Sequence, residues 1–146
     1  MNKIIIGLDE TPAAAASLRW AADYARLTGA ALHAVHAAHL PHTRVPQGVH
    51  GVISLDDDTR LPDDYRRRIY QIWNEIGPES AWLLDIYLGE PGPILTELSA
   101  DADLLVIGTQ FHVGLGRVFP GSVSHFCLTH SQVPVIAVPA RIHSAP

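Results

Sequence analysis

The chain has 146 residues, 47% of them apolar and 17% charged, with a formal net charge of −5. This composition predicts one globular domain with one hydrophobic core. The negative charge argues against a broad surface for phosphate backbones and excludes nucleic acid as the principal partner. Residues 4–8 are apolar, but the run is too short for a signal peptide or a membrane span. We therefore expect a cytoplasmic protein without membrane contact.

The first strand and helix are predicted from a continuous apolar run and its flanking residues. Residues 4–8 do not alternate with polar residues, which is typical of a strand covered on both faces. Thr11 is suited to cap a helix that has Pro12 at its first position. Gly29 provides the stop signal for this helix.

The alternation of strands and helices is predicted to continue to the end of the chain. A second strand is predicted at residues 31–37, and a long loop at about 39–62 leads to a helix that opens at Pro62. The later predicted elements are a strand at 82–88, a short helix around 94–98, a strand at 104–107, a helix at 120–130, a strand at 133–138 and a tail at 141–146. This order predicts one α/β domain over residues 1–146, with a doubly wound parallel sheet and helices on both faces.

A ligand site is predicted in the glycine-rich loop that joins the strand at 104–107 to the last helix. In such sheets, ligands bind beyond the carboxyl ends of the strands, where the strand order reverses. Gly108 ends the buried strand, and Gly121 and Ser122 precede the helix. Free amides and a partial positive charge at a helix amino terminus favour a phosphate, and Arg117 would add a nearby cation. Gly114 and Gly116 are expected to loosen this loop. No Walker motif is present, and the dinucleotide fingerprint is incomplete because Phe119 stands where its third glycine would be.

These residues also carry a resemblance that runs along nearly the whole chain. The matching segments are residues 4–9, 17–21, 32–36, 89–91, 102–109, 121–124 and 133–135. In these segments the chain resembles the universal stress proteins. The resemblance implies a five-stranded, Rossmann-like sheet, a homodimer built through the last strand and a role in the stress response.

The resemblance further implies an ATP or AMP site, because one branch of the family carries the pattern G-x2-G-x9-G-[ST] around the phosphates. Gly108, Gly121 and Ser122 stand at the right spacing, but Phe111 occupies the place of the second glycine. A side chain there adds bulk beside the phosphates and makes a positive φ angle costly. By the same resemblance, Asp9 would lie near the ribose and phosphates.

Four further residues complete the nucleotide site that the resemblance implies. Val35 would place backbone groups at the adenine edge, and Ile107 would line the pocket. Gly7 and Val123 belong to the same expected set. No metal is expected, except Mg²⁺ accompanying the nucleotide.

Two alternatives to a nucleotide-binding regulatory module stay open. In the first, Phe111 fills the phosphate space and the chain is a nucleotide-independent interaction protein, with partners on the dimer or on residues 40–60. In the second, the chain is an adenylating enzyme. We do not expect an enzyme, because residues 7–11 lack the Ser-Gly-Gly-x-Asp-Ser loop that holds pyrophosphate. Structural roles also compete: Asp9 could simply help to cap the first helix, and Ser122 could be an ordinary first-turn residue.

Histidine spacing raises the hypothesis of a metal site. His33, His36, His39 and His42 recur at every third position. Strand alternation should place His33 and His36 on opposite faces, although His36, His39 and His42 could still gather at the end of the strand. The single cysteine, Cys127, is expected to be a small buried hydrophobe.

Overall fold

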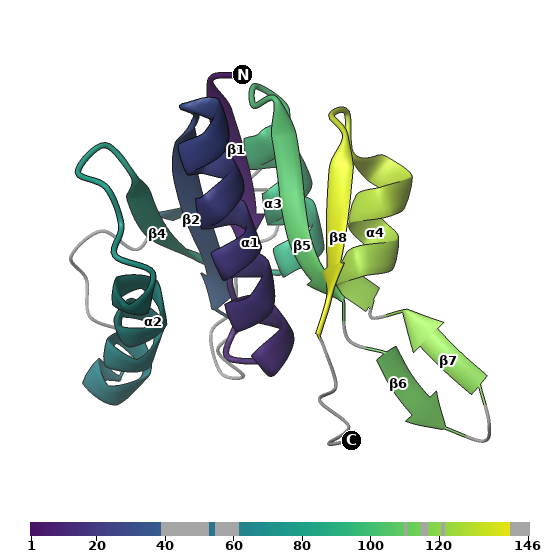
Figure 1. Ribbon diagram of the computed structural model, residues 1–146. Coiled ribbons are helices and arrows are strands. Elements are labelled where there is room, and N and C mark those ends of the chain that lie inside the picture. Colours follow the sequence, from purple (N-terminus) through teal and green to yellow (C-terminus); the bar gives the residue numbers. More distant parts are fainter. Residues whose placement is uncertain (39–52, 55–61, 110, 115–116, 121, 141–146) are drawn as a thin grey trace, which may run out of the picture.

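Five parallel strands form the central sheet of the molecule (Figure 1). The computed structural model describes residues 1–38, 53–54, 62–109, 111–114, 117–120 and 122–140. The parallel strands are β1 (Lys3–Gly7), β2 (Ala31–Ala38), β4 (Leu83–Leu88), β5 (Leu104–Thr109) and β8 (Val135–Pro139). The predicted fold class is confirmed.

The order of the strands determines where the sheet offers a ligand crevice. The parallel strands lie in the order β4-β2-β1-β5-β8. In the centre, Ile5 of β1 is aligned with His33 on one side and Leu105 on the other. The chain runs outward from β1 through β2 to β4 and then returns to β5. The order therefore reverses between β1 and β5, and their carboxyl ends meet at the switch point where doubly wound sheets bind ligands.

Helices cover both faces of this sheet (Figure 1). On one face, residues of α1 (Pro12–Thr28) and α2 (Asp63–Glu75) share one apolar core with the even-numbered apolar residues of β1, including Ile4 and Ile6. On the other face, α3 (Pro91–Ser99) and α4 (Ser122–His130) pack over Ile5 and Leu105. Ile4, Ile5 and Ile6 are all fully buried. A central strand with two covered faces explains why this run is continuously apolar.

The first helix begins and ends at the residues that its sequence signals predict. The hydroxyl oxygen of Thr11 accepts a hydrogen bond from the Ala14 amide at 3.3 Å, and Pro12 opens the helix. Gly29 ends it in the left-handed conformation with φ of 72°. Thr11 and Gly29 thus satisfy backbone groups that a helix leaves unpaired at its ends, and a cap of this kind stabilises by about 1 kcal/mol.

Two segments that were predicted as loops contain strands. Within residues 39–62, β3 (Ile53–Ser54) pairs antiparallel with the outer edge of β4. Between β5 and α4, the expected glycine-rich loop forms a hairpin of β6 (Phe111–Gly114) and β7 (Arg117–Pro120). The hairpin projects away from the sheet (Figure 1). None of the helices in the described part of the chain is long and apolar enough to cross a membrane.

Candidate functional site

A hollow of about 90 Å³ lies at the switch point between β1 and β5. It is lined by Gly7, Leu8, Asp9, Val35, Ala37, Pro91, Leu95, Ile107, Gly108 and Val123. Six residues that were predicted to form a nucleotide site are therefore brought together, namely Gly7, Asp9, Val35, Ile107, Gly108 and Val123. They come from β1, β2, β5, α4 and the β1–α1 loop, and only the fold makes them neighbours.

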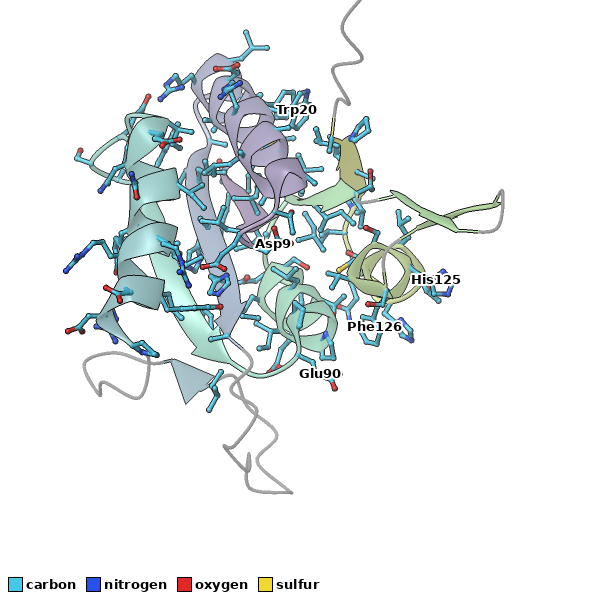
Figure 2. All side chains as sticks on the ribbon, turned by 90° about the horizontal axis from the view of Figure 1, so that it is seen from below. Asp9, Trp20, Glu90, His125 and Phe126 are labelled. Atoms are coloured by element: carbon cyan, nitrogen blue, oxygen red, sulfur yellow. The ribbon has the colours of Figure 1, made fainter. Side chains whose placement is uncertain are left out.

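Asp9 stands at the mouth of this hollow and also holds the start of α1. Figure 2, seen from the carboxyl ends of the strands, shows Asp9 in the middle of the molecule between α1 and α3. Its Oδ1 accepts hydrogen bonds from the Thr11 amide at 2.7 Å and from the Thr11 hydroxyl at 2.5 Å. Asp9 thus helps to cap α1, which is the structural role that was left open for it. The same hydrogen bonds hold its exposed carboxylate beside the hollow.

Two glycines let helices approach the hollow closely. A Cβ atom on Gly108 would lie 2.8 Å from the carbonyl oxygen of Ala13, in the first turn of α1. A Cβ atom on Gly7 would lie 2.7 Å from Cδ1 of Leu95, on α3. Both glycines are therefore required by close packing, and both positions draw a helix toward the crevice.

The amino terminus of α4 lies beside the end of β5. Ser122 is the first residue of this helix and is exposed, and Val123 lines the hollow. The buried Ser124 hydroxyl donates to the Gly108 carbonyl at 3.3 Å and ties the helix to the strand. The first amides of α4 have no carbonyl partner within the helix, as the sequence argument for an anion site requires. Gly121 lies outside the described residues.

The floor of the hollow is apolar. Val35 and Ile107 are 1% and 2% exposed, respectively. The Val35 carbonyl accepts a hydrogen bond from the Leu8 amide at 2.9 Å. One of its two lone pairs is therefore already engaged by the β1–α1 loop, and the other could accept from a ligand.

The hairpin changes the expectations for two residues. Phe111 is the first residue of β6 and pairs with Pro120 at the base of the hairpin. Strand backbone has negative φ. The conformational cost of a positive φ angle, which was expected for a side chain at this position, therefore does not arise at Phe111. Arg117 pairs with Gly114 at the other end, roughly 10 Å along the strand from Pro120. The expectation that it supplies a cation next to the helix start is not supported by this backbone geometry.

Thr109 is a candidate that sequence reasoning missed. It ends β5, and strand alternation places it on the same face as Ile107. The residue is 7% exposed, and its Oγ1 has no hydrogen-bond partner within the part of the chain that the structure describes. A buried unpaired hydroxyl is costly unless something bonds to it. In the sequence, the feature that could have identified Thr109 was its position directly after Gly108.

The histidine series raised the hypothesis of a metal site, but the structure gives His36 another role. Its Nδ1 lies 2.6 Å from the carbonyl oxygen of Leu8, and its Nε2 contacts the Tyr65 hydroxyl on α2. A carbonyl only accepts, so Nδ1 carries the proton and Nε2 accepts from Tyr65. Burial lowers the pKa of His36, against a backbone hydrogen bond and nearby carboxylates that raise it. His36 is therefore a neutral imidazole between the β1–α1 loop and α2.

His33, the other histidine of the series that the structure describes, does not join it. His33 lies on the opposite face of β2, as alternation predicted, and its Nε2 donates to Asp85 at 2.7 Å. His39 and His42 lie outside the described residues. Within the described ranges, no group of three or more His, Cys, Asp or Glu side chains could hold a metal ion.

With this geometry established, comparison with known proteins identifies the family. The family model for the universal stress protein family matches residues 1–139. The chain belongs to the universal stress protein family. Universal stress protein Rv2623 of Mycobacterium tuberculosis is 34% identical over 144 residues, which cover 92% of this chain and 46% of that protein. The chain thus spans about half the length of the curated relatives it matches.

Solved structures of universal stress proteins share the fold of this chain. One, in complex with cAMP, has a TM-score of 0.61 and 20% identity, and covers 96% of this chain and 98% of its own. Another, from Archaeoglobus fulgidus in complex with dAMP, has a TM-score of 0.56 and 22% identity, and covers 94% and 98%. At these identities the similarity establishes the α/β architecture of the family member described here.

Proposed function

We propose that this universal stress protein is a regulatory module that binds an adenine nucleotide, ATP or AMP, in the crevice between β1 and β5. The observation that carries the proposal is the meeting of Gly7, Asp9, Val35, Ile107, Gly108 and Val123 around one hollow at the switch point. Two universal stress proteins of the same fold have been solved with cAMP and dAMP, which supports an adenine nucleotide as the ligand class. The proposal is one of binding and not of catalysis.

In the proposed complex, each part of the nucleotide has a chemical counterpart. The phosphates would lie at Gly108, Gly121 and Ser122, where the amides of α4 and the partial charge of the helix favour an anion. The ribose would lie near Asp9, and the adenine near the backbone of Val35. Asp9 beside the phosphates also offers a carboxylate to Mg²⁺ that accompanies the nucleotide.

A pair of charge variants on α4 tests the proposal. Val123→Asp places a carboxylate beside the phosphates, in a first helical turn where an acidic residue favours the helix itself. Two like charges about 5 Å apart repel by roughly 3 kcal/mol at an effective dielectric constant near 20, or about a hundredfold in affinity. His125→Asp is the matched control, because His125 is exposed and points away from the crevice (Figure 2).

Isothermal titration calorimetry with ATP and with AMP measures the nucleotide affinity of the unmodified protein and of both variants. The expected result is saturable binding that Val123→Asp weakens by about a hundredfold and that His125→Asp retains within about threefold, a difference comparable to that of an exposed charge pair. A flat titration of the unmodified protein at millimolar nucleotide would refute the proposal. Equal affinity of both variants for nucleotide would show that the nucleotide does not bind at the amino terminus of α4.

A second function is favoured by one observation, the presence of Phe111 where the nucleotide-binding pattern has a glycine. In this alternative, the aromatic ring occupies the phosphate space and the chain is an interaction protein that needs no nucleotide. Phe111→Gly separates the two functions. Affinity for ATP that appears only in the variant supports a blocked site, whereas nucleotide carried through purification by the unmodified protein contradicts it.

We further propose that the protein is a cytoplasmic homodimer that pairs through β8. This strand lies at the end of the sheet order and has β5 as its one neighbour among the described strands. Ile136 and Val138 are only partly buried, beside a wide hollow that Trp20 also lines. An edge strand with half-covered apolar side chains favours pairing with a second copy.

A further inference from the structure

The β1–α1 loop is held in place from two sides. On the α1 side, Asp9 accepts both hydrogen bonds from Thr11. On the α2 side, His36 donates to the carbonyl of Leu8, and Arg68 donates to Glu10 at 2.9 Å. Because Leu8 and Asp9 line the hollow, the contacts on the α2 side set the position of one wall of the site.

Of the two contacts on the α2 side, the hydrogen bond from His36 restricts the β1–α1 loop more strongly than the ion pair of Arg68 and Glu10. Arg68 and Glu10 form an exposed ion pair with side chains 58% and 39% exposed, and such pairs stabilise little. His36 is 3% exposed, and its hydrogen bond to Leu8 is enclosed between β2 and α2. A buried hydrogen bond restricts the loop far more than an exposed ion pair does.

The Leu8 carbonyl determines which nitrogen of His36 carries the proton, because a carbonyl oxygen can only accept. A neutral imidazole has one donor and one acceptor nitrogen, and the two tautomers exchange these roles. The proton therefore lies on Nδ1, facing the Leu8 carbonyl, and the Tyr65 hydroxyl, which can donate or accept, donates to Nε2. With the proton on Nε2 instead, Nδ1 and the Leu8 carbonyl would be two acceptors in contact.

We propose that His36 is a positioning residue of the nucleotide site: it holds the Leu8–Asp9 wall through the Leu8 carbonyl, and Tyr65 of α2 holds the His36 ring through Nε2. The inference rests on the proposed nucleotide function. It also makes α2 part of the site without any contact between this helix and the ligand. The affinity for nucleotide then depends on the fraction of molecules in which the wall is in place.

Three variants isolate the hydrogen bond from packing. His36→Leu removes the donor and fills the space. His36→Asn keeps an amide N–H at the place of Nδ1, and therefore keeps the donor to the Leu8 carbonyl. His33→Leu is the matched control, because it removes a histidine of the same strand that is bonded to Asp85 on the opposite face. Thermal unfolding of each variant establishes that it is folded at the temperature of the titrations.

The measured quantity is the Kd for AMP by calorimetry. His36→Leu should weaken binding by roughly three- to tenfold, the factor that corresponds to one hydrogen bond of ordinary strength. His36→Asn and His33→Leu should both remain close to the unmodified protein. Equal affinity in His36→Leu, or an equal loss in His36→Asn, would overturn the positioning role while leaving nucleotide binding intact. Failure of the unmodified protein to bind AMP or ATP would instead refute the proposed function, and this inference with it.

The tautomer gives a readout that does not depend on nucleotide. Nitrogen-15 NMR of the histidine rings should show the proton of His36 on Nδ1 in the unmodified protein and also in Tyr65→Phe, because the Leu8 carbonyl needs a donor in both. A His36 ring with its proton on Nε2 in the unmodified protein would overturn the inference directly. If His36→Leu does not fold, the ring spectrum of the unmodified protein and the Kd of His36→Asn can each still overturn the inference.

Discussion

Gly108→Ala is expected to destabilise the protein because it forces β5 and α1 apart. The added Cβ would lie 2.8 Å from the carbonyl oxygen and 3.0 Å from the carbonyl carbon of Ala13. Both are backbone atoms in the first turn of α1, and Ala13 is itself buried, so no side-chain rotation relieves the contact. Overpacking of this kind costs about 1–3 kcal/mol. The reduced entropy of the unfolded chain returns about 0.4–1 kcal/mol, which leaves a net loss of about 1–2 kcal/mol.

Gly7→Ala is the matched comparison, because the new atom would meet only the end of the flexible Leu95 side chain. The entropy gain is the same in both variants and cancels between them, so the Gly7 variant should be the more stable by about 1 kcal/mol or more. Urea unfolding followed by tryptophan fluorescence gives both free energies of unfolding. If Gly108→Ala and Gly7→Ala unfold at the same urea concentration, the contact between α1 and the end of β5 is not as close as the structure has it.

Three further predictions follow from the buried groups and the sheet edge. Burial lowers the pKa of His36 below its ordinary value of 6.5. Below pH 6.5 the unfolded chain therefore gains a proton that the folded chain lacks, and stability should fall with decreasing pH, by up to about 1.4 kcal/mol per pH unit, until the pKa of the folded state is reached. Urea titrations should show this dependence weakened in His36→Asn, and parallel pH curves for the two proteins would contradict it. Burial raises the pKa of the Cys127 thiol to about 11, so a thiol reagent at pH 8 should label it only after addition of denaturant; rapid labelling of the native protein would count against its burial. Sedimentation velocity at micromolar concentration should give a dimer, and a monomer alone would argue against pairing through β8.

The sheet was predictable because its strands carry strong local signals. The apolar runs at Ile4–Ile6 and Leu104–Ile107 are too continuous for any strand that has one wet face, and they lie in β1 and β5 at the centre of the sheet. The signals at Thr11, Pro12 and Gly29 likewise act within one helix. In contrast, β3 has two residues and is defined by its partner β4, so no property of Ile53 or Ser54 alone would have indicated it.

The hairpin between β5 and α4 was missed for a different reason. Gly114 and Gly116 were interpreted as loosening a loop, although glycine between short apolar runs is also a hairpin signal. Val113 and Val118 face each other across this ladder, so the alternative was present in the sequence. The family pattern, which counts residues between glycines, does not distinguish the two conformations.

Part of the candidate site could likewise be predicted from local sequence signals, whereas the rest depends on contacts between residues far apart in the sequence. The switch-point rule and the family pattern were enough to select six residues that line one hollow, because both depend on strand ends. The contacts of His36 with Leu8 and Tyr65 join residues 28 and 29 positions apart, and no periodicity predicts such a pair. Thr109 was missed because an unpaired hydroxyl is recognised only once its neighbours are known.

The paired base of the hairpin also has a practical consequence. Phe111 and Pro120 are register partners, so the chain leaves β5 and comes back to α4 at nearly the same point in space. Beyond this pair the ladder projects away from the sheet (Figure 1). Its length could therefore vary among related chains, or be extended by an inserted peptide or fluorescent tag, while the sheet keeps its shape. Such an insertion would report on events at the crevice from a position outside the central sheet.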